Sequence, residues 1–222
     1  MDAGHLQQIS NAVLLTLQVS LTATAISAAA GLPLGVAVAT APRRIRDIAS
    51  PFLNAMMGLP PVVVGLLVYL VLSRSGPLGS MRLLYTPAGM VIAQTLLICP
   101  IVIALTKNHA DTLVDSHCEQ LVAMGAKGWT LVAALLWEAR FALITVVLAG
   151  AGRAFAEVGA VMIVGGNIEG VTRVITTTIA TETNKGDISV ALGLGAVLIA
   201  LVLVLNVAAW LVRRYAVQRF GA

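Results

Sequence analysis

Charged side chains are scarce in this 222-residue chain. Asp, Glu, Lys and Arg make up only 11% of the residues, whereas a soluble domain carries roughly 25%. Aromatic residues are also few, at 5%, while 59% of the residues are hydrophobic and the mean hydropathy is +0.94. So little charge excludes an ordinary soluble domain and indicates that lipid surrounds much of the chain.

Residues for metal, redox or nucleotide chemistry are also few. The three histidines do not cluster, and the adjacent His117 and Cys118 have no third ligand nearby, so we expect no metal site. The stretch Gly125-Ala126-Lys127-Gly128 lacks the spacing and the Ser or Thr of a phosphate-binding loop, so we expect no ATP hydrolysis by this chain. The net charge of +4 comes from basic residues between the apolar runs, which does not indicate nucleic-acid binding.

Five apolar runs are long enough to cross a bilayer, which takes about 20 residues. They predict an all-α, polytopic membrane protein with a single transmembrane domain over residues 1–222. Pro33 predicts a kink in the first run, Pro60-Pro61 a break in the second, and Pro100 lies in the third. The runs cover roughly residues 11–41, 51–73, 87–106, 140–164 and 187–212.

Basic residues predict the orientation in the cell (inner) membrane. With five spans, the segments 42–50, 107–140 and the tail after 212 share one side and carry nine Lys or Arg, against four on the other side. Because positive residues favour the cytoplasm, we expect an outside N-terminus and a cytoplasmic C-terminus.

The cytoplasmic segment 107–140 is patterned rather than a simple linker. Asp115 or Ser116 could cap a short amphipathic helix, Gly125 and Gly128 should interrupt it, and a second apolar stretch follows. Such an element could dock on a partner or lie on the membrane surface, and the pattern alone leaves both open.

This segment resembles the EAA loop of permease subunits of ATP-binding-cassette importers. Glu119, Ala123, Gly125, Ala126 and Trp129 carry the resemblance, while Gln120 and Leu121 replace two alanines and Glu138 stands where a proline is frequent. The resemblance implies a coupling helix that fits a cleft on a separate ATPase subunit.

Two opposite charges lie inside the fourth apolar run. Arg153 and Glu157 are four residues apart, which places them on one face of a helix. Each ion alone near the bilayer centre costs about 2.5–3.5 kcal/mol, so we expect the two to pair inside the bundle. The pair could serve transport or only fix helix packing, and the sequence leaves both open.

A non-apolar segment, 165–186, follows on the external side. We expect a short re-entrant or surface helix there, preceded by a break at a Gly-Gly-Asn sequence. Irregular backbone at membrane depth is tolerated where it lines a polar cavity, although an ordinary loop is the alternative. With Arg153 and Glu157, the candidates for a translocation path are Gly165, Gly166, Asn167, Thr172 and Arg173.

The run from Arg153 to Arg173 resembles the permease subunits for molybdate and tungstate, and the tungstate branch more closely. Glu157-Val158-Gly159-Ala160 and Gly166-Asn167-Ile168 carry this resemblance. It implies a type I importer permease of the MetI-like fold, working as a homodimer with two ATPase subunits and an extracytoplasmic oxyanion-binding protein. It also implies that ATP and magnesium bind to the ATPase rather than to this chain.

Other functions stay open at this point. Within the same family, the substrate could be molybdate or sulfate instead of tungstate. In other classes, Arg153 and Glu157 could serve a secondary transporter as a proton relay, or an intramembrane enzyme as acid and base.

Overall fold

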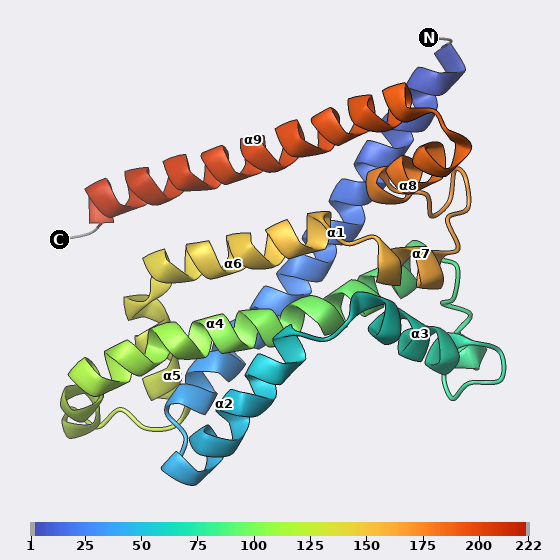
Figure 1. The fold of residues 1–222 in the computed structure, drawn as a ribbon. Helices are drawn as coiled ribbons and strands as arrows, with labels where there is room; N and C mark the ends of the chain where they lie inside the picture. Colours follow the sequence, from blue (N-terminus) through green and yellow to red (C-terminus); the bar gives the residue numbers. More distant parts are fainter. Residues whose placement is uncertain (1–2, 221–222) are drawn as a thin grey trace. The chain divides into compact units, whose positions relative to one another are not determined.

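The computed structural model describes residues 3–220, with the side chains of 3–6, 115–119, 212–213, 216–217 and 219–220 outside the description. Throughout this part of the chain the regular structure is helical, with no strand, as the sequence predicts (Figure 1). The helices are α1 (Ala3–Ala39), α2 (Arg43–Met57), α3 (Pro61–Leu72), η1 (Gly79–Met81), α4 (Pro87–Ala123), α5 (Trp129–Glu138), α6 (Arg140–Phe155), α7 (Gly159–Gly165), α8 (Ile175–Lys185) and α9 (Ile188–Phe220).

Five membrane crossings can be built from these helices. Three helical segments of the described chain are each long and apolar enough: Gln7–Ala39, Pro87–Val114 and Ile188–Leu211. The pairs α2–α3 and α5–α6 reach the same length and apolarity only together, with bends of 95° and 84°. The first bend falls at Pro60-Pro61, as predicted, because Pro61 occupies the first position of α3 and lacks the amide that would continue α2.

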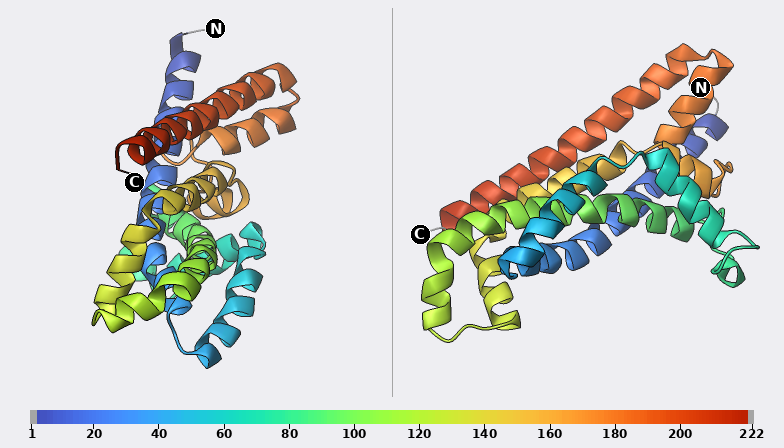
Figure 2. Two further views of the ribbon diagram at one scale, coloured as in Figure 1. Left: turned by 90° about the vertical axis from the view of Figure 1, so that its left-hand side faces the viewer. Right: turned by 60° about the horizontal axis from the view of Figure 1, so that its bottom comes forward.

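Two sequence predictions about helix ends are wrong. No helix begins at Asp115 or Ser116, because α4 continues without interruption through Ala123, and Figure 2 shows its last turns bending away from its long apolar part. The fourth run, 140–164, does not form one helix either, because α6 ends at Phe155 and α7 begins at Gly159. The predicted short helix in segment 165–186 is confirmed as α8.

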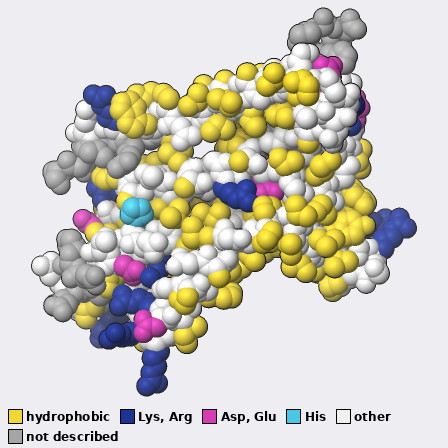
Figure 3. Space-filling model, in the orientation of Figure 1, with side chains coloured by type: hydrophobic (Ala, Val, Ile, Leu, Met, Phe, Trp, Pro, Cys, Tyr) yellow, Lys and Arg dark blue, Asp and Glu magenta, His cyan; other side chains and the backbone are white. Residues whose placement is uncertain are grey.

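The chain packs as two compact units. The first comprises Met1–Ala23, Leu59–Leu97 and Ala151–Leu205, and the second comprises Thr24–Gly58, Ile98–Gly150 and Asn206–Ala222. The face drawn in Figure 3 is largely hydrophobic, and most of its charged side chains lie away from its middle. Such a surface suits contact with lipid, where polar groups are costly.

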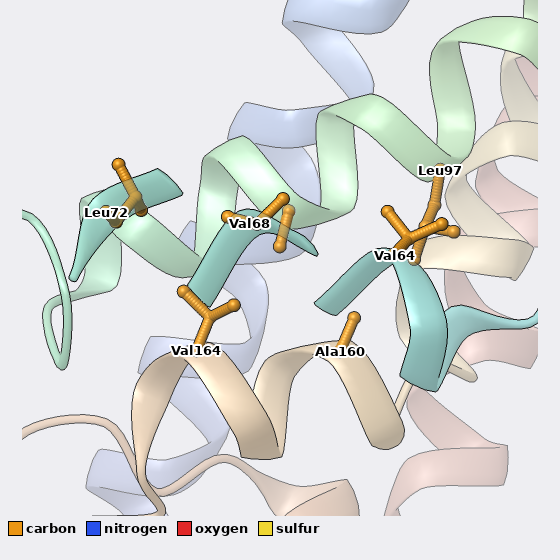
Figure 4. Close-up of a cluster of buried hydrophobic side chains, with 7 residues drawn as sticks. Val64, Val68, Leu72, Leu97, Ala160 and Val164 are labelled. Atoms are coloured by element: carbon orange, nitrogen blue, oxygen red, sulfur yellow. The ribbon is translucent and has the colours of Figure 1, made fainter. Parts of the chain in front are cut away.

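The core of the first unit lies where α3 crosses α7. The Cβ that Gly65 lacks would stand 2.7 Å from Ala160 Cα, so the two helices touch through their backbones. Small residues allow such an approach where lipid provides no hydrophobic drive for association. Around this contact, Figure 4 shows apolar side chains from α3, α4 and α7: Val64, Val68, Leu72, Ala93, Leu97, Ala160 and Val164.

The second unit has a smaller core between α1, α4 and α5, made of Val36, Ala39, Ala110, Val132 and Leu135. Gly31 and Gly35 bring α1 close to α4, since an added Cβ would lie 2.9 Å from Val102 and 2.6 Å from Thr106. This glycine pair therefore serves close helix packing within the chain.

Candidate functional site

The break between α6 and α7 contains the predicted ion pair. Arg153 Nη1 lies 2.9 Å from Glu157 Oε2, which confirms the pairing. Glu157 lies in the break rather than in a helix, and its Oε1 accepts a hydrogen bond from the Ala160 amide of α7 at 3.0 Å. Its side chain is only 3% exposed, whereas that of Arg153 is 32% exposed. The buried Glu157 carboxylate thus bonds to residues on both sides of the break, Arg153 of α6 and Ala160 of α7.

Side chains from other helices satisfy the backbone that the break exposes. Gln94 of α4 donates from Nε2 to the Ala154 carbonyl at 3.1 Å, and the Ser20 hydroxyl of α1 lies 3.5 Å from the same oxygen. Thr176 of α8 donates to the Glu157 carbonyl at 3.0 Å. Sequence reasoning missed Gln94 and Thr176, although an amide inside an apolar run is the kind of signal that marks such a role.

The Gly-Gly-Asn sequence forms a sharp turn after α7. Gly166 and Asn167 both adopt positive φ, +72° and +51°. The Asn167 amide group donates to the Thr181 hydroxyl of α8 at 2.8 Å, and the Gly166 amide donates to the Met162 carbonyl at 2.9 Å. Tyr85 packs over the turn, and its hydrogen bond to the Tyr69 hydroxyl is the main reason that the pKa of Tyr85 is raised.

Thr172 closes the loop that follows this turn. Its hydroxyl donates to the Gly165 carbonyl at 2.6 Å and accepts from the Ile168 amide at 2.9 Å, and the side chain is buried. The Thr172 hydroxyl and the Gly166 amide, both from candidate residues of the translocation path, are therefore engaged within the chain. They shape the turn here, and their role in a translocation path stays a prediction.

Arg173 lines a cavity of about 670 Å³ in the first unit. Its Nη1 pairs with Glu169 at 3.1 Å, and Gln8 donates to the other oxygen of that carboxylate at 2.6 Å. The charged lining residues comprise three acids and two bases: Glu169, Glu182, Asp187, Arg173 and Lys185. This balance does not favour a dianion inside the cavity itself.

The predicted coupling segment lies in the second unit, where α4 ends and α5 begins. Gly125 adopts φ +90°, and the bonds from its amide to Val122 and from the Ala126 amide to Leu121 form a Schellman motif. Gly128, with φ +54°, precedes α5. The predicted interruptions at both glycines are confirmed.

This turn presents apolar side chains to its surroundings. Ala123 is exposed, Met124 is 76% exposed, and Trp129, the first residue of α5, is 68% exposed. The side chain of Glu119 lies outside the described residues. Exposed apolar residues gathered around one turn are typical of a surface that a partner covers.

An ionic cluster at the start of segment 107–140 was not predicted from the sequence. Asp111 of α4 lies 2.8 Å from Lys107 and 3.7 Å from Arg46 of α2. Arg46 also donates to the carbonyl of Ala39 at the end of α1, at 3.2 Å. The i, i+4 spacing of Lys107 and Asp111 was the available signal, but the contact with Arg46 requires the fold.

Comparison with known proteins adds three relatives. A probable anion ABC transporter permease of Haloferax volcanii is 41% identical over 86% of this chain and 84% of its own. The tungstate uptake system permease TupB of Peptoclostridium acidaminophilum is 42% identical over 90% of this chain and 87% of its own. TupB of Campylobacter jejuni is 39% identical over 73% and 68%.

The model of one protein family matches residues 31–221, which include the coupling segment and the break between α6 and α7. Family members are multi-pass inner-membrane components that work with a separate binding protein and, in ABC transporters, an ATPase. The chain belongs to the family of binding-protein-dependent transport system inner membrane components.

Proposed function

We propose that this chain is the permease subunit of an ATP-binding-cassette importer that moves tungstate into the cytoplasm. The observation that carries the proposal is 42% identity over 90% of the chain to a tungstate uptake permease. The resemblance of residues 156–173 to the tungstate branch supports the same substrate.

The functional assembly in this proposal is a homodimer with two ATPase subunits, which bind ATP and magnesium, and an extracytoplasmic binding protein. The N-terminus lies outside and the C-terminus in the cytoplasm, which agrees with the excess of Lys and Arg on the cytoplasmic segments. The exposed Trp129 and Met124 then belong to the surface that contacts the ATPase.

Coupling in this proposal runs through the turn between α4 and α5. Gly125 and Gly128 fix the shape of the turn because both adopt backbone conformations that other residues rarely enter. Movement of the ATPase subunits on ATP binding would pull on this turn, and α4 would carry the displacement into the membrane because it is continuous from Pro87 to Ala123.

The translocation path is proposed to run past the two irregular segments of the first unit, 156–158 and 166–174. Irregular backbone is tolerated at membrane depth only where protein or water shields it from lipid. Arg173 supplies positive charge for attracting the oxyanion, and Arg153, one third exposed, is a second cation beside the first break. The Glu157 carboxylate holds Arg153 in place.

Uptake by reconstituted vesicles tests the function. The full complex, with its binding protein outside and ATP inside, should accumulate labelled tungstate, while vesicles without ATP should not. An excess of unlabelled sulfate should leave tungstate uptake unchanged if tungstate is the substrate. Sulfate accumulation that tungstate fails to inhibit would overturn the substrate and leave the transporter class intact.

A further inference from the structure

Residues 73–86, which connect α3 to α4, form a folded loop that packs on the first unit (Figure 1). The Leu78 amide donates to the carbonyl of Val71 at 3.0 Å, so the loop folds back on the last turn of α3. Further along, Leu83 and Leu84 pack against the apolar core where α3 crosses α7. These contacts give the loop a defined shape, which it presents to its surroundings.

The loop contains two residues in a disfavoured backbone conformation and is attached to a third. Among the described residues other than glycine, positive φ occurs at Arg82 (+51°), Tyr85 (+61°) and Asn167 (+51°). Such conformations cluster at functional sites. The Tyr85 amide donates to the Val164 carbonyl of α7 at 3.0 Å, and the Tyr85 ring lies against Gly166, where a side chain would not fit. The loop is therefore joined to the turn at Asn167, beside the proposed translocation path.

Two unpaired cations lie on this loop. Arg74 and Arg82 are both exposed, and residues 73–86 include no acidic side chain. Within the described part of the chain, neither guanidinium has an ion-pair or hydrogen-bond partner. Arg173 and Lys185, which share the external side in the proposed topology, are by contrast paired with carboxylates at 3.1 and 2.7 Å. The two loop arginines are thus free to attract an anionic group from outside the chain.

Exposed apolar side chains accompany the two arginines. Leu78, Met81 and Tyr85 are all exposed on the same loop. Arg, Met and Tyr are enriched in the contact surfaces between proteins, whereas Lys, Asp and Glu are depleted there and are absent from this loop. The exposed residues Arg74, Leu78, Met81, Arg82 and Tyr85, here called the loop surface, therefore have the composition of a protein contact.

We propose that the loop surface docks an acidic face of the extracytoplasmic binding protein. The external position of the loop and the existence of that partner rest on the proposed function. Positive residues are usually kept to cytoplasmic loops, so membrane topology does not explain Arg74 and Arg82. The fixed shape of the loop favours a protein over outer-leaflet headgroups, because a preorganised surface increases affinity for a partner of fixed shape. Through Tyr85, docking reaches the Gly166–Asn167 turn.

ATPase activity of the full complex in phosphatidylcholine nanodiscs tests the docking surface. The rate is measured against the concentration of the tungstate-loaded binding protein. Arg74→Glu should raise the concentration for half-maximal stimulation roughly tenfold at low salt, because electrostatic steering changes association rates by at least about that factor. Adding Arg82→Glu should raise it further, and saturating binding protein should restore the wild-type rate. The difference should shrink as salt is added, because salt screens exposed charges.

Arg44→Glu is the matched control, since it makes the same change in charge at an exposed arginine of the cytoplasmic side and should keep the wild-type half-maximal concentration. The Tm in detergent checks that the variants fold, and Arg74→Glu decides if Arg82→Glu does not, because only Arg82 has a positive φ.

A stimulated wild type with an unchanged half-maximal concentration in Arg74→Glu overturns this inference and leaves the proposed function intact. So does a defect that appears only when the nanodiscs contain phosphatidylglycerol, because lipid headgroups would then be the partner. A wild-type complex that the binding protein does not stimulate would overturn the proposed function, and this inference with it.

Discussion

Removing the charge of Glu157 should destabilise the chain more than removing it together with the charge of Arg153. The carboxylate is almost fully buried and its partner lies 2.9 Å away. Glu157→Gln is the sharpest single change, because the amide oxygen can still accept from the Ala160 amide while the ion pair disappears. The matched partner variants are Arg153→Gln and the double variant with both glutamines.

The magnitude follows from burial. Breaking a buried ion pair by removing one partner costs about 3–5 kcal/mol in soluble cores. Arg153 is 32% exposed, so its stranded charge keeps some solvation and we expect roughly 2 kcal/mol for Glu157→Gln. Arg153→Gln strands the more deeply buried carboxylate and should cost more. The double variant, with no unpaired charge, should be closer to the wild type than either single variant.

Thermal unfolding in detergent measures this order. For a chain of about this length, 1 kcal/mol shifts Tm by roughly 2–4 °C, so Glu157→Gln should lower Tm by about 4–8 °C. The double variant should recover at least half of that loss. If the Tm loss of the double variant equals the sum of the Tm losses of the two single variants, the two side chains are not coupled. The ion pair then does not stabilise the break.

Three further changes test other parts of the fold. Gly125→Leu places a side chain on a residue with φ +90°, at a cost of about 1–2 kcal/mol. It should lower ATP-driven uptake and ATPase binding. The control Gly193→Leu, in a helix with open space around that residue, should leave both unchanged. Gly65→Leu should push α3 away from the α7 backbone and cost about 1–3 kcal/mol, seen as a lower Tm in detergent. Asp111→Asn should cost less than about 1 kcal/mol, because its ion pairs are partly exposed. Its Tm in detergent should therefore fall by no more than about 2–4 °C, and a larger loss would contradict this estimate.

Local chemistry explains what the sequence predicted well. The Pro60-Pro61 pair favours a break, because Pro61 disfavours helical backbone at residue 60 and is itself suited to the first position of a helix, so the break in the second span could be predicted without the fold. Gly125 and Gly128 were predicted interruptions for a similar local reason. The Arg153–Glu157 pair followed from a spacing of four residues and the cost of an isolated charge in lipid.

Helix ends were predicted less well, because hydropathy marks the edge of the membrane and not the end of a helix. Residues after Lys107 are polar, so a loop was expected, but Lys107 and Asp111 pair one turn apart and α4 continues. The break at residues 156–158 depends on Gln94 and Thr176, which lie 60 and 19 residues away from their acceptors. No short window of sequence contains those partners.

The hydrogen bonds at the break between α6 and α7, and the one between α1 and α8, constrain how the first unit can move during transport. Gln94 holds the Ala154 carbonyl, Thr176 holds the Glu157 carbonyl, and Thr16 of α1 accepts from the first amide of α8 at 3.0 Å. A displacement of α8 alone would break the last two of these bonds, each leaving a buried polar group unpaired at a cost of about 1–3 kcal/mol. Moving α8, residues 156–158 and the attached parts of α1, α4 and α6 together breaks none of them. Conformational change in this permease is therefore expected to carry the broken span and α8 as one body, with adjustment confined to segments outside these contacts.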